Sequence, residues 1–567
     1  MLKREAKTRM EFGEEKQKRV LIVGLDGGTF EIIKPFAKKG YLPNINRIMN
    51  QGCYGILDST IPPITAPAWS SFMTGKNPGK HGFLHFFEFS PGEHQLAYNF
   101  YSGKFLNFSN IRESTLFELL GENGKEVISI NMPITYPPRE IHGKMISCWL
   151  TPPGAKNYTY PLSLREEYPD YRIDLYFGER MFTLPPAGKQ VVAKEFFSDI
   201  NDVLDKRAKT ALSMISKESW DLFVVCFTET DRIQHFFWRA INPDYPGYNN
   251  PSVQEERRLF MEFYKKLDGY IGELIDWAEK RNAMVCIMSD HGFGPPPSKR
   301  FHMNYFLREN GYLIANQDNS INCLEILKES AWQYKVSRAF LRDVLGISTP
   351  KRFLIGKRAD VTWGYTMAWS VCLNNNIGGI FFNRKLINIP IENFTSKLVS
   401  TIFSIVDPEN GRQIVQQVLP REKLFSGEKV SEFPDLIYFL EPEYEAGLPG
   451  KFDLFAKTLI SKNPYPSGRG NHNKAGIYLF YGKDICTKGN SGNRSIMDIL
   501  PTILLYLQIP IPDDLDGEAI SDIFRADKKP IYSRSKNFSY KSIEVVENEK
   551  SESEKSIRDK IKNLGYL

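Results

Sequence analysis

Short, continuous apolar runs alternate with longer segments of helical periodicity along much of the chain. RVLIVGLDGG (19–28) is typical of a buried strand closed by a glycine turn, and DLFVVCFTETDRIQH (221–235) and NAMVCIMSDHGFGPP (282–296) repeat this design. Helical periodicity near 192–217 and 254–281 places a helix before each of the two later strands. Such alternation indicates an α/β protein with a largely parallel sheet. We therefore predict a three-layer α/β/α sandwich with a central, mostly parallel sheet.

Further elements extend this pattern on either side. LPNINRIMNQGCYG (42–55) predicts a second helix, and a short helix is expected to begin at about 67–69. KEVISINMPITYP (125–137) predicts a strand and a loop. Towards the C-terminus, SGRGNHNKAGIYLFYG (467–482) predicts a loop and a strand, and SIMDILPTILLYLQIPIP (495–512) predicts an amphipathic helix that ends at a proline.

A large insertion is predicted to interrupt this core. Between about 301 and 465 the regular alternation breaks up, although a β-like run (378–383) and a helix near 391–405 are expected there. We interpret this stretch as an inserted cap, and we expect a smaller insertion near 150–205. The chain then divides into a charged leader, the first part of the catalytic core, the cap, the second part of the core and a charged tail, with expected boundaries 1–18, 19–300, 301–465, 466–526 and 527–567.

Length and charge limit the range of functions. The chain has 567 residues with 42% hydrophobic composition, well above the roughly 150 residues of a typical domain, which leaves room for one large core with insertions. The formal net charge of +6 is small and spread along the chain, so it does not indicate a nucleic-acid partner. The basic residues near 350–358 would have to cluster in space to change that interpretation.

Cysteine usage and the N-terminus bear on the compartment. Seven cysteines are scattered without any CxxC pair, so no disulfide framework is indicated. The first residues are charged and no apolar signal core follows them. No stretch of about 20 apolar residues predicts a transmembrane helix. We expect a cytoplasmic protein, and the sequence does not indicate its oligomeric state.

Metal-binding residue types follow the predicted strands. The carboxyl ends of parallel strands meet at one edge of a sheet, where ligands commonly bind. Two of these residues, Asp231 and His235, are four apart and would share one face of a helical turn. Three Asp and three His can hold two divalent metal ions and leave one hydroxyl as a nucleophile. The seven residues are Asp26, Thr65, Asp231, His235, Asp290, His291 and His472.

Each of these residues alone has a simpler explanation. An aspartate after a strand is often a helix cap or a turn residue, a lone histidine such as His472 is more often structural, and Thr65 between prolines is by default a turn residue. Their joint occurrence at strand ends favours a metal centre, since independent turns seldom give this pattern. Paired metals about 3.5–4 Å apart are a recurring arrangement for displacement at phosphorus. The sequence therefore predicts a metal-dependent hydrolase of phosphate esters.

Several motifs together resemble a known family. GLDG, ITAPAWSSFMTGKNPGKHG, TETDRIQH, SDHGFGP, GNHNKAGIYLFYG and MDILPTILLYLQIPIPDDLDG, in this order over about 19–525, resemble the alkaline phosphatase superfamily, in particular its type I phosphodiesterase/nucleotide pyrophosphatase branch. The resemblance implies two metal ions, usually zinc and with manganese as a second possibility. It assigns the first metal to Asp231, His235 and His472, the second to Asp26, Asp290 and His291, and the nucleophile, bound to the second metal, to Thr65.

The chain departs from this branch at one position. Three residues after the nucleophile, where the nucleotide pyrophosphatases carry an asparagine that donates to a phosphate oxygen, this sequence has Ala68. A donor would have to come from elsewhere, and the candidates are the Ala66 N–H or, in the cap, Lys299, Arg300 and His302. The segment TAPAW also lacks the arginine of the sulfatase motif, which disfavours a sulfatase.

The expected function is thus a phosphodiesterase or nucleotide pyrophosphatase that acts on a small phosphate-ester or nucleotide-like substrate through a phospho-threonine intermediate. A phosphomonoesterase or phosphotransferase of the same superfamily is the first alternative, because the same metals serve both reactions. The alternative of another class is a non-catalytic binding protein that retains the metals.

Overall fold

The computed structural model describes most of the chain outside its two ends and seven internal gaps. The described residues are 17–88, 105–175, 193–315, 361–447, 456, 458–463, 468–486 and 488–535. The basic segment near 350–358 lies outside these ranges, as do most of the predicted leader and the tail from 536 onwards.

The central sheet follows from the apolar runs recognised in the sequence. In β1 (Arg19–Leu25), residues Val20 and Ile22 pack into the core on one face of the sheet, and Leu21 and Val23 pack into the core on the other. Because successive side chains of a strand point to opposite faces, a strand that is apolar throughout must be covered on both sides. These two cores make the molecule a three-layer sandwich.

The main sheet is mostly parallel, which confirms the predicted fold class. Next to β1, the strands β6 (Leu222–Phe227), β7 (Ala283–Met288), β3 (Val127–Ile130) and β4 (Gly143–Ile146) run parallel. Strand β17 (Ala475–Tyr481) is antiparallel to its neighbours β7 and β2 (Cys53–Asp58). Strand β5 pairs antiparallel with β4 at one edge, and β19 (Arg494–Ser495) also pairs with β2. The spatial order is β18 (Gly489–Asn490), β2 (Cys53–Asp58), β17 (Ala475–Tyr481), β7 (Ala283–Met288), β1, β6 (Leu222–Phe227), β3 (Val127–Ile130), β4 (Gly143–Ile146) and β5 (Thr159–Tyr160).

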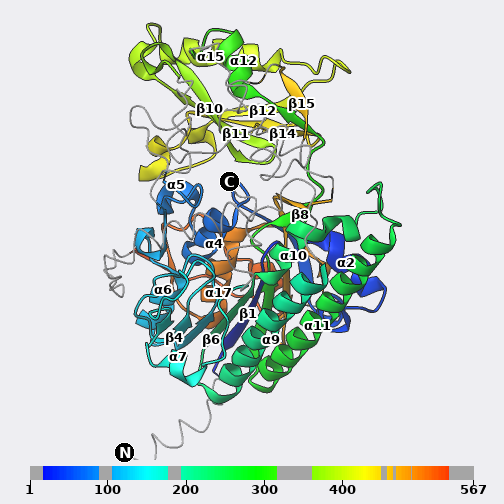
Figure 1. Ribbon diagram of the computed structural model, residues 1–567. Helices are drawn as coiled ribbons and strands as arrows, with labels where there is room; N and C mark the ends of the chain where they lie inside the picture. The colour runs from blue at the N-terminus through cyan, green and yellow to red at the C-terminus, as the bar shows by residue number, and fades with distance from the viewer. Residues whose placement is uncertain are drawn as a thin grey trace, which may run out of the picture.

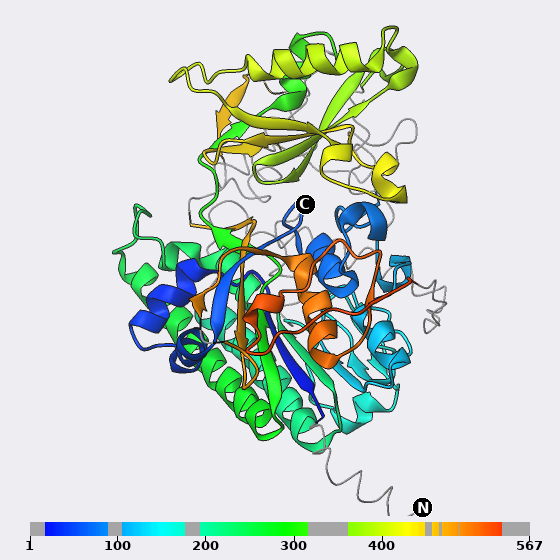
Figure 2. The same cartoon turned by 180° about the vertical axis from the view of Figure 1, so that it is seen from behind.

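Helices cover both faces of this sheet (Figures 1 and 2). One layer comprises α2 (Phe30–Lys38), α3 (Pro43–Gln51), α9 (Ala193–Lys217), α10 (Glu229–Phe237) and α11 (Pro251–Lys280). The other comprises α4 (Thr65–Thr74), α6 (Leu116–Glu122) and α17 (Ile499–Leu507). Parts of the predicted smaller insertion near 150–205 belong to the sandwich itself. Strand β5 extends the main sheet, and residues 193–205 form the first half of α9. Among the described residues, no helix has the length and apolarity needed to cross a membrane.

Two local expectations are wrong in detail. The helix within 495–512 is not amphipathic, because every residue of α17 is buried between the sheet and its neighbours, and it ends at Leu507 with Gln508 in the left-handed conformation rather than at a proline. Helix α4 begins at Thr65 itself, two residues before Pro67, so that Thr65 is its first residue.

The described part of the predicted cap has its own apolar core and lies above the sandwich in Figure 1. An antiparallel sheet has the order β10 (Ala368–Asn374), β11 (Ile377–Phe382), β13 (Leu436–Leu440) and β12 (Val415–Pro420). A smaller sheet joins β14 (Tyr444–Ala446), β9 (Lys299–Phe301) and β15 (Ile460–Lys462). Helices α12 (Met303–Glu309) and α15 (Ile391–Phe403) complete this unit.

The described part of the cap contacts the sandwich at more than one place. The helix α5 (Pro78–His81) packs on η7 (Glu428–Glu432), where Asn77 Nδ2 donates to Ser426 Oγ at 2.9 Å. The turn between β10 and β11 reaches the sheet edge at which β1, β6 and β7 end, because Asn374 Nδ2 donates to the Pro63 carbonyl at 3.2 Å. The cap therefore touches the edge of the sheet where the predicted functional residues lie.

Candidate metal centre

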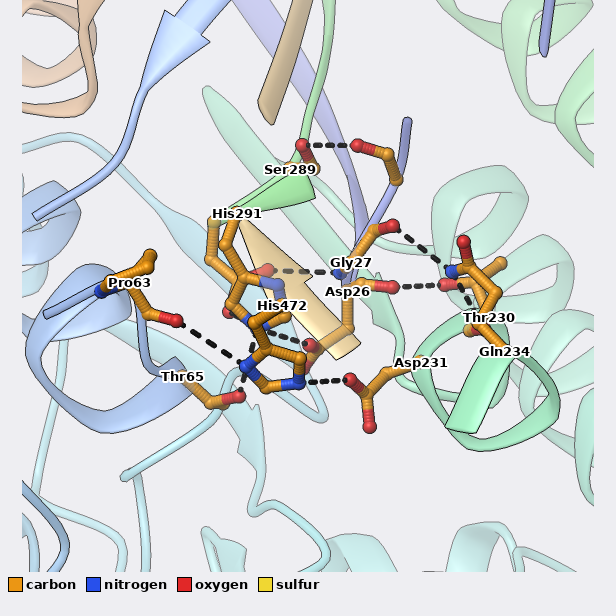
Figure 3. A network of polar contacts seen from close by, with 12 residues as sticks. Asp26, Gly27, Pro63, Thr65, Thr230, Asp231, Gln234, Ser289, His291 and His472 are labelled. Carbon is orange, nitrogen blue, oxygen red and sulfur yellow. Dashed lines mark hydrogen bonds and ion pairs between the residues drawn. The ribbon is translucent and has the colours of Figure 1, made fainter. Parts of the chain in front are cut away.

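The seven predicted residues come from five separate segments of the chain and meet at one edge of the main sheet. Asp26 directly follows β1, Asp290 follows β7 by two residues, and Asp231 lies in the first turn of α10 after β6. Because β17 is antiparallel to β7, its N-terminal end lies at this same edge, and the preceding short strand β16 (Asn471–Asn473) carries His472. β16 pairs with β8 (Gly292–Gly294), so His472 lies on a strand rather than in the expected loop. Figure 3 shows the resulting cluster.

Asp231, His235 and His472 form the first group of ligand atoms. His235 Nε2 lies 3.3 Å from Asp231 Oδ1, His472 Nε2 lies 3.1 Å from the same oxygen, and the two Nε2 atoms are 2.9 Å apart. Helix α10 brings the first two together because residues four apart share one face. Ligands of a tetrahedral ion with bonds of 2.0–2.1 Å lie about 3.3 Å from each other, which is close to these separations.

Asp26, Asp290 and His291 form the second group, with ligand atoms within 4.8 Å of one another. His291 Nε2 is 3.2 Å from Asp290 Oδ2 and 3.7 Å from Asp26 Oδ1. Thr65 Oγ1 lies 3.4 Å from the same Nε2. His291 also lies within 4.8 Å of Asp231 and His472 in a further group, and the rings of His291 and His472 stack with centroids 3.7 Å apart. The two groups are therefore directly adjacent.

Backbone carbonyls define the tautomers of two of the histidines. His472 Nδ1 lies 3.3 Å from the Pro63 carbonyl oxygen, and His291 Nδ1 lies 3.1 Å from the Gly292 carbonyl oxygen. A carbonyl oxygen can only accept, so each Nδ1 must carry a proton and donate it. Burial, as the main cause, lowers the pKa of both histidines, which keeps the rings neutral. The unprotonated Nε2 of His472 then points at a carboxylate oxygen and at another ring nitrogen.

The carboxylates of the centre also lie in a buried space. Asp26 and Asp290 are buried, and their Oδ1 and Oδ2 atoms respectively have no hydrogen-bond partner among the described residues. Burial raises the pKa of Asp290 to about 8, and burial together with the charges of Asp290 and Asp231 raises the pKa of Asp26. Burial opposes ionisation of Asp231, but the His235 ring holds the pKa of Asp231 well below its usual range. Acceptors that face one another in a buried space are typical of a cation site.

The turn after β1 is held by groups that the sequence did not single out. Gly27 has φ of 65°, and a Cβ there would lie 2.8 Å from the Phe293 ring, so glycine is required. Its N–H donates to Asp290 Oδ1 at 3.0 Å, and its carbonyl accepts from Gln234 Nε2 at 3.0 Å. Thr230 Oγ1 donates to the Asp26 carbonyl at 2.6 Å. The residues of TETDRIQH that flank Asp231 thus fix the backbone next to Asp26.

The sequence profile of the type I phosphodiesterase/nucleotide pyrophosphatase family matches residues 20–358, which is more than half of the chain. The chain belongs to this family. The predicted family membership is thereby confirmed, and with it the expectation of a phosphoester hydrolase that depends on metal. A search of curated proteins finds no relative of this family member.

A solved structure supports the fold of this phosphodiesterase family member. Phosphonoacetate hydrolase from Sinorhizobium meliloti 1021, solved with phosphonoformate, superposes with a TM-score of 0.51 at 13% identity and covers 87% of this chain and 96% of its own. Human ectonucleotide pyrophosphatase/phosphodiesterase 5 reaches 0.44 at 13% identity, with 90% and 100% covered. The murine protein, solved in an inactive form with AMP, reaches 0.45 at 11% identity, with 89% and 100% covered.

The cap residues suggested as phosphate-oxygen donors are engaged within the cap. Lys299 Nζ forms ion pairs with Asp407 and Glu409 at 2.6 and 2.8 Å. The remaining two candidates also have cap partners, since Arg300 pairs with Glu445 at 2.9 Å and His302 Nε2 lies 2.8 Å from Ser461 Oγ. Of the four candidates, the Ala66 N–H, in the first turn of α4, is the one next to Thr65.

An asparagine of the cap contacts the centre instead. Asn375, in the turn between β10 and β11, donates from Nδ2 to the His472 carbonyl at 2.6 Å. Its φ of 38° is a conformation that asparagine tolerates better than most residues. The run Asn374–Asn376 predicts a turn between two β-like segments, but nothing in the sequence relates this turn to His472, which is 97 residues away.

His81 provides a stability test away from the centre. Phe83 N–H donates to its Nδ1 at 3.2 Å, so Nε2 carries the proton and lies 2.9 Å from Ser71 Oγ. Burial lowers the pKa of His81 from 6.5 to about 3. Because the unfolded chain takes up this proton first, stability should fall as the pH decreases from 6.5 towards 3, by up to about 1.4 kcal/mol per pH unit. Urea unfolding of chelator-treated wild type and His81→Gln between pH 7 and 4 checks this. The advantage of the wild type should shrink towards pH 4, whereas a constant difference would contradict the assignment.

Proposed function

We propose that this chain is a phosphodiesterase or nucleotide pyrophosphatase with Thr65 as nucleophile and two divalent metal ions, most readily zinc, with manganese as the second choice. Asp231, His235 and His472 would hold one ion, and the second would be held by Asp26, Asp290 and His291. The observation that carries this proposal is the buried cluster of carboxylate oxygens and histidine nitrogens, in which His472 Nε2 lies 3.1 Å from Asp231 Oδ1 and 2.9 Å from His235 Nε2, next to Asp26, Asp290 and His291. Such a set of ligand atoms suits divalent cations.

Thr65 is suitably located for nucleophilic attack. It is the first residue of α4, so its hydroxyl lies at the helix end where backbone N–H groups, including that of Ala66, can donate to phosphate oxygens. Bound metal ions supply activation of the hydroxyl and stabilisation of negative charge on the phosphate and leaving oxygens. Thr65 Oγ1 attacks phosphorus, the bond from phosphorus to the alcohol oxygen breaks, and the alcohol leaves with a proton. Water then attacks phosphorylated Thr65 and releases the phosphate monoester.

A substrate panel on metal-loaded protein tests this function. We expect bis-aryl phosphate and nucleotide diphosphate esters to be hydrolysed faster than a mono-aryl phosphate. A mono-aryl preference would indicate the phosphomonoesterase alternative, and no turnover of any ester would leave the metal-retaining binding protein. Phosphonoacetate belongs in the panel because it is the substrate named for the hydrolase of similar fold.

We also propose that the protein is cytoplasmic. The six cysteines that the structure describes form no disulfide with one another, which supports a reducing compartment such as the cytoplasm.

The contact from Asn375 predicts a measurable coupling between the cap and the centre. Asn375→Ala removes the donor to the His472 carbonyl, so the segment that carries His472 is held less firmly. We expect metal affinity and kcat/KM each to fall by about 10-fold, as is usual when a partner of a metal-binding histidine is lost. Asn376→Ala is the matched control, because Asn376 donates to Leu440 within the cap at 3.1 Å. Equal effects of the two substitutions would refute a specific role for Asn375.

A further inference from the structure

Arg232 is a buried cation next to the candidate metal centre. It follows Asp231 in α10, and it is only 3% exposed. Its guanidinium lies over the Trp149 ring, 4.5 Å from the centroid, and Nη2 is 3.6 Å from Asp174 Oδ2. Its Nε and Nη2 atoms are fully buried, and among the described residues they have no hydrogen-bond partner. A charged donor buried in this way is strongly unfavourable unless something else accepts from it.

Other buried arginines of the sandwich differ from Arg232 in this respect. Each of them donates at least two charge-assisted or carbonyl hydrogen bonds to described residues. They are Arg139, which donates to Glu118 and to carbonyls, Arg172, which donates to Asp199 and Asp202, and Arg207, which donates to Glu229 and Ile173. A guanidinium has five N–H donors in a planar fork. Arg232, by contrast, donates no hydrogen bond from Nε or Nη2 to any described residue.

The position of Arg232 places this fork at the candidate metal centre. The sheet order sets β3 and β4 on one side of β6, and β1 and β7 on the other. Because β4 runs parallel to β3, β6 and β1, Trp149 after β4 lies at the same sheet edge as Asp26 and Asp231, and the guanidinium stacked on Trp149 lies at this edge, on the β3 side of Asp231.

We propose that the Arg232 guanidinium, positioned by Trp149 and Asp174, binds an anionic oxygen of the substrate. The planar fork matches the oxygens of phosphate, and stacking on Trp149 fixes its orientation. Position 68 carries alanine and offers no side-chain donor, so an additional donor is needed near Thr65. The oxygen belongs either to the phosphate that Thr65 attacks or to a second phosphate of the substrate. This inference rests on the proposed function.

The test combines turnover with anion binding. Wild type, Arg232→Gln and Arg232→Lys are loaded with zinc, and kcat/KM is measured with a bis-aryl phosphate and with a diaryl diphosphate. The affinity for inorganic phosphate is measured by calorimetry. Arg172→Gln is the control, since it removes an equally buried arginine whose fork is taken by Asp199 and Asp202. We expect Arg232→Gln to lose about 10- to 100-fold in kcat/KM and in phosphate affinity, and the lysine variant to lose less.

The pattern across substrates identifies the oxygen. Equal losses on both substrates assign Arg232 to the phosphate attacked by Thr65, and a loss confined to the diphosphate assigns it to the second phosphate. Values within about twofold of wild type for both substrates and for inorganic phosphate overturn the proposal. If Arg232→Gln does not fold, the same criterion applies to Arg232→Lys. If wild type itself turns over no ester, the proposed function fails, while phosphate affinity still decides the role of Arg232.

Discussion

Thr65→Ala should lower kcat/KM for phosphate esters by about 10⁴-fold or more, with the metal content of the protein unchanged. The hydroxyl lies 3.4 Å from His291 Nε2, and Thr65 as a residue is 1% exposed, so the substitution removes the nucleophile without altering the charged groups around it. Steady-state kinetics and elemental analysis of the same preparation measure both quantities.

Thr65→Ser is the matched control for this substitution. It keeps the hydroxyl at the first position of α4 and should retain a substantial part of the activity. A Thr65→Ala protein that is as active as Thr65→Ser would remove Thr65 from the reaction. Loss of metal in Thr65→Ala would instead mean that the hydroxyl is needed to bind it.

Asp290→Asn has the second large expected effect. The asparagine can still accept from the Gly27 N–H through its amide oxygen, so the turn after β1 should persist. The negative charge that would hold the second ion is lost, however. We expect the metal content to fall from about two ions to about one per chain, and kcat/KM to fall by about 10³-fold.

Asp268→Asn serves as the control for Asp290→Asn. Asp268 is an equally buried carboxylate, but it lies in α11. Its oxygens accept from the backbone N–H groups of Ile45 and Asn44 at 2.9 and 3.0 Å, and these residues belong to α3 rather than to the candidate centre. This variant should be less stable and yet retain its metal. A full complement of metal in Asp290→Asn would show that Asp290 is not a ligand.

Much of the candidate centre could be predicted because its residues mark strand ends. Asp26 and Asp290 each follow a run of apolar residues, and parallel strands bring their carboxyl ends to one edge irrespective of separation in the sequence. The pairing of Asp231 with His235 follows from helical spacing alone. His472 could be included because it lies just before the apolar run of β17, although the short strand β16 that carries it gives no periodic signal.

Other features could not be predicted because they depend on tertiary contacts. Helix α17 has a pattern that looks amphipathic, but the sheet and α4 bury its polar positions as well. The roles inferred for Asn375 and Arg232 arise from contacts across long stretches of sequence, with His472 and Asp174 respectively. In the sequence they are an ordinary turn asparagine and an ordinary helix arginine.

The central claim is that side chains remote in sequence enclose two metal ions beside Thr65. Anomalous diffraction from crystals of the zinc-loaded protein, recorded on both sides of the zinc edge, tests it directly. We predict two peaks about 3.5–4 Å apart, one among Asp231, His235 and His472 and the other among Asp26, Asp290 and His291. A single peak, or peaks elsewhere in the molecule, would contradict it.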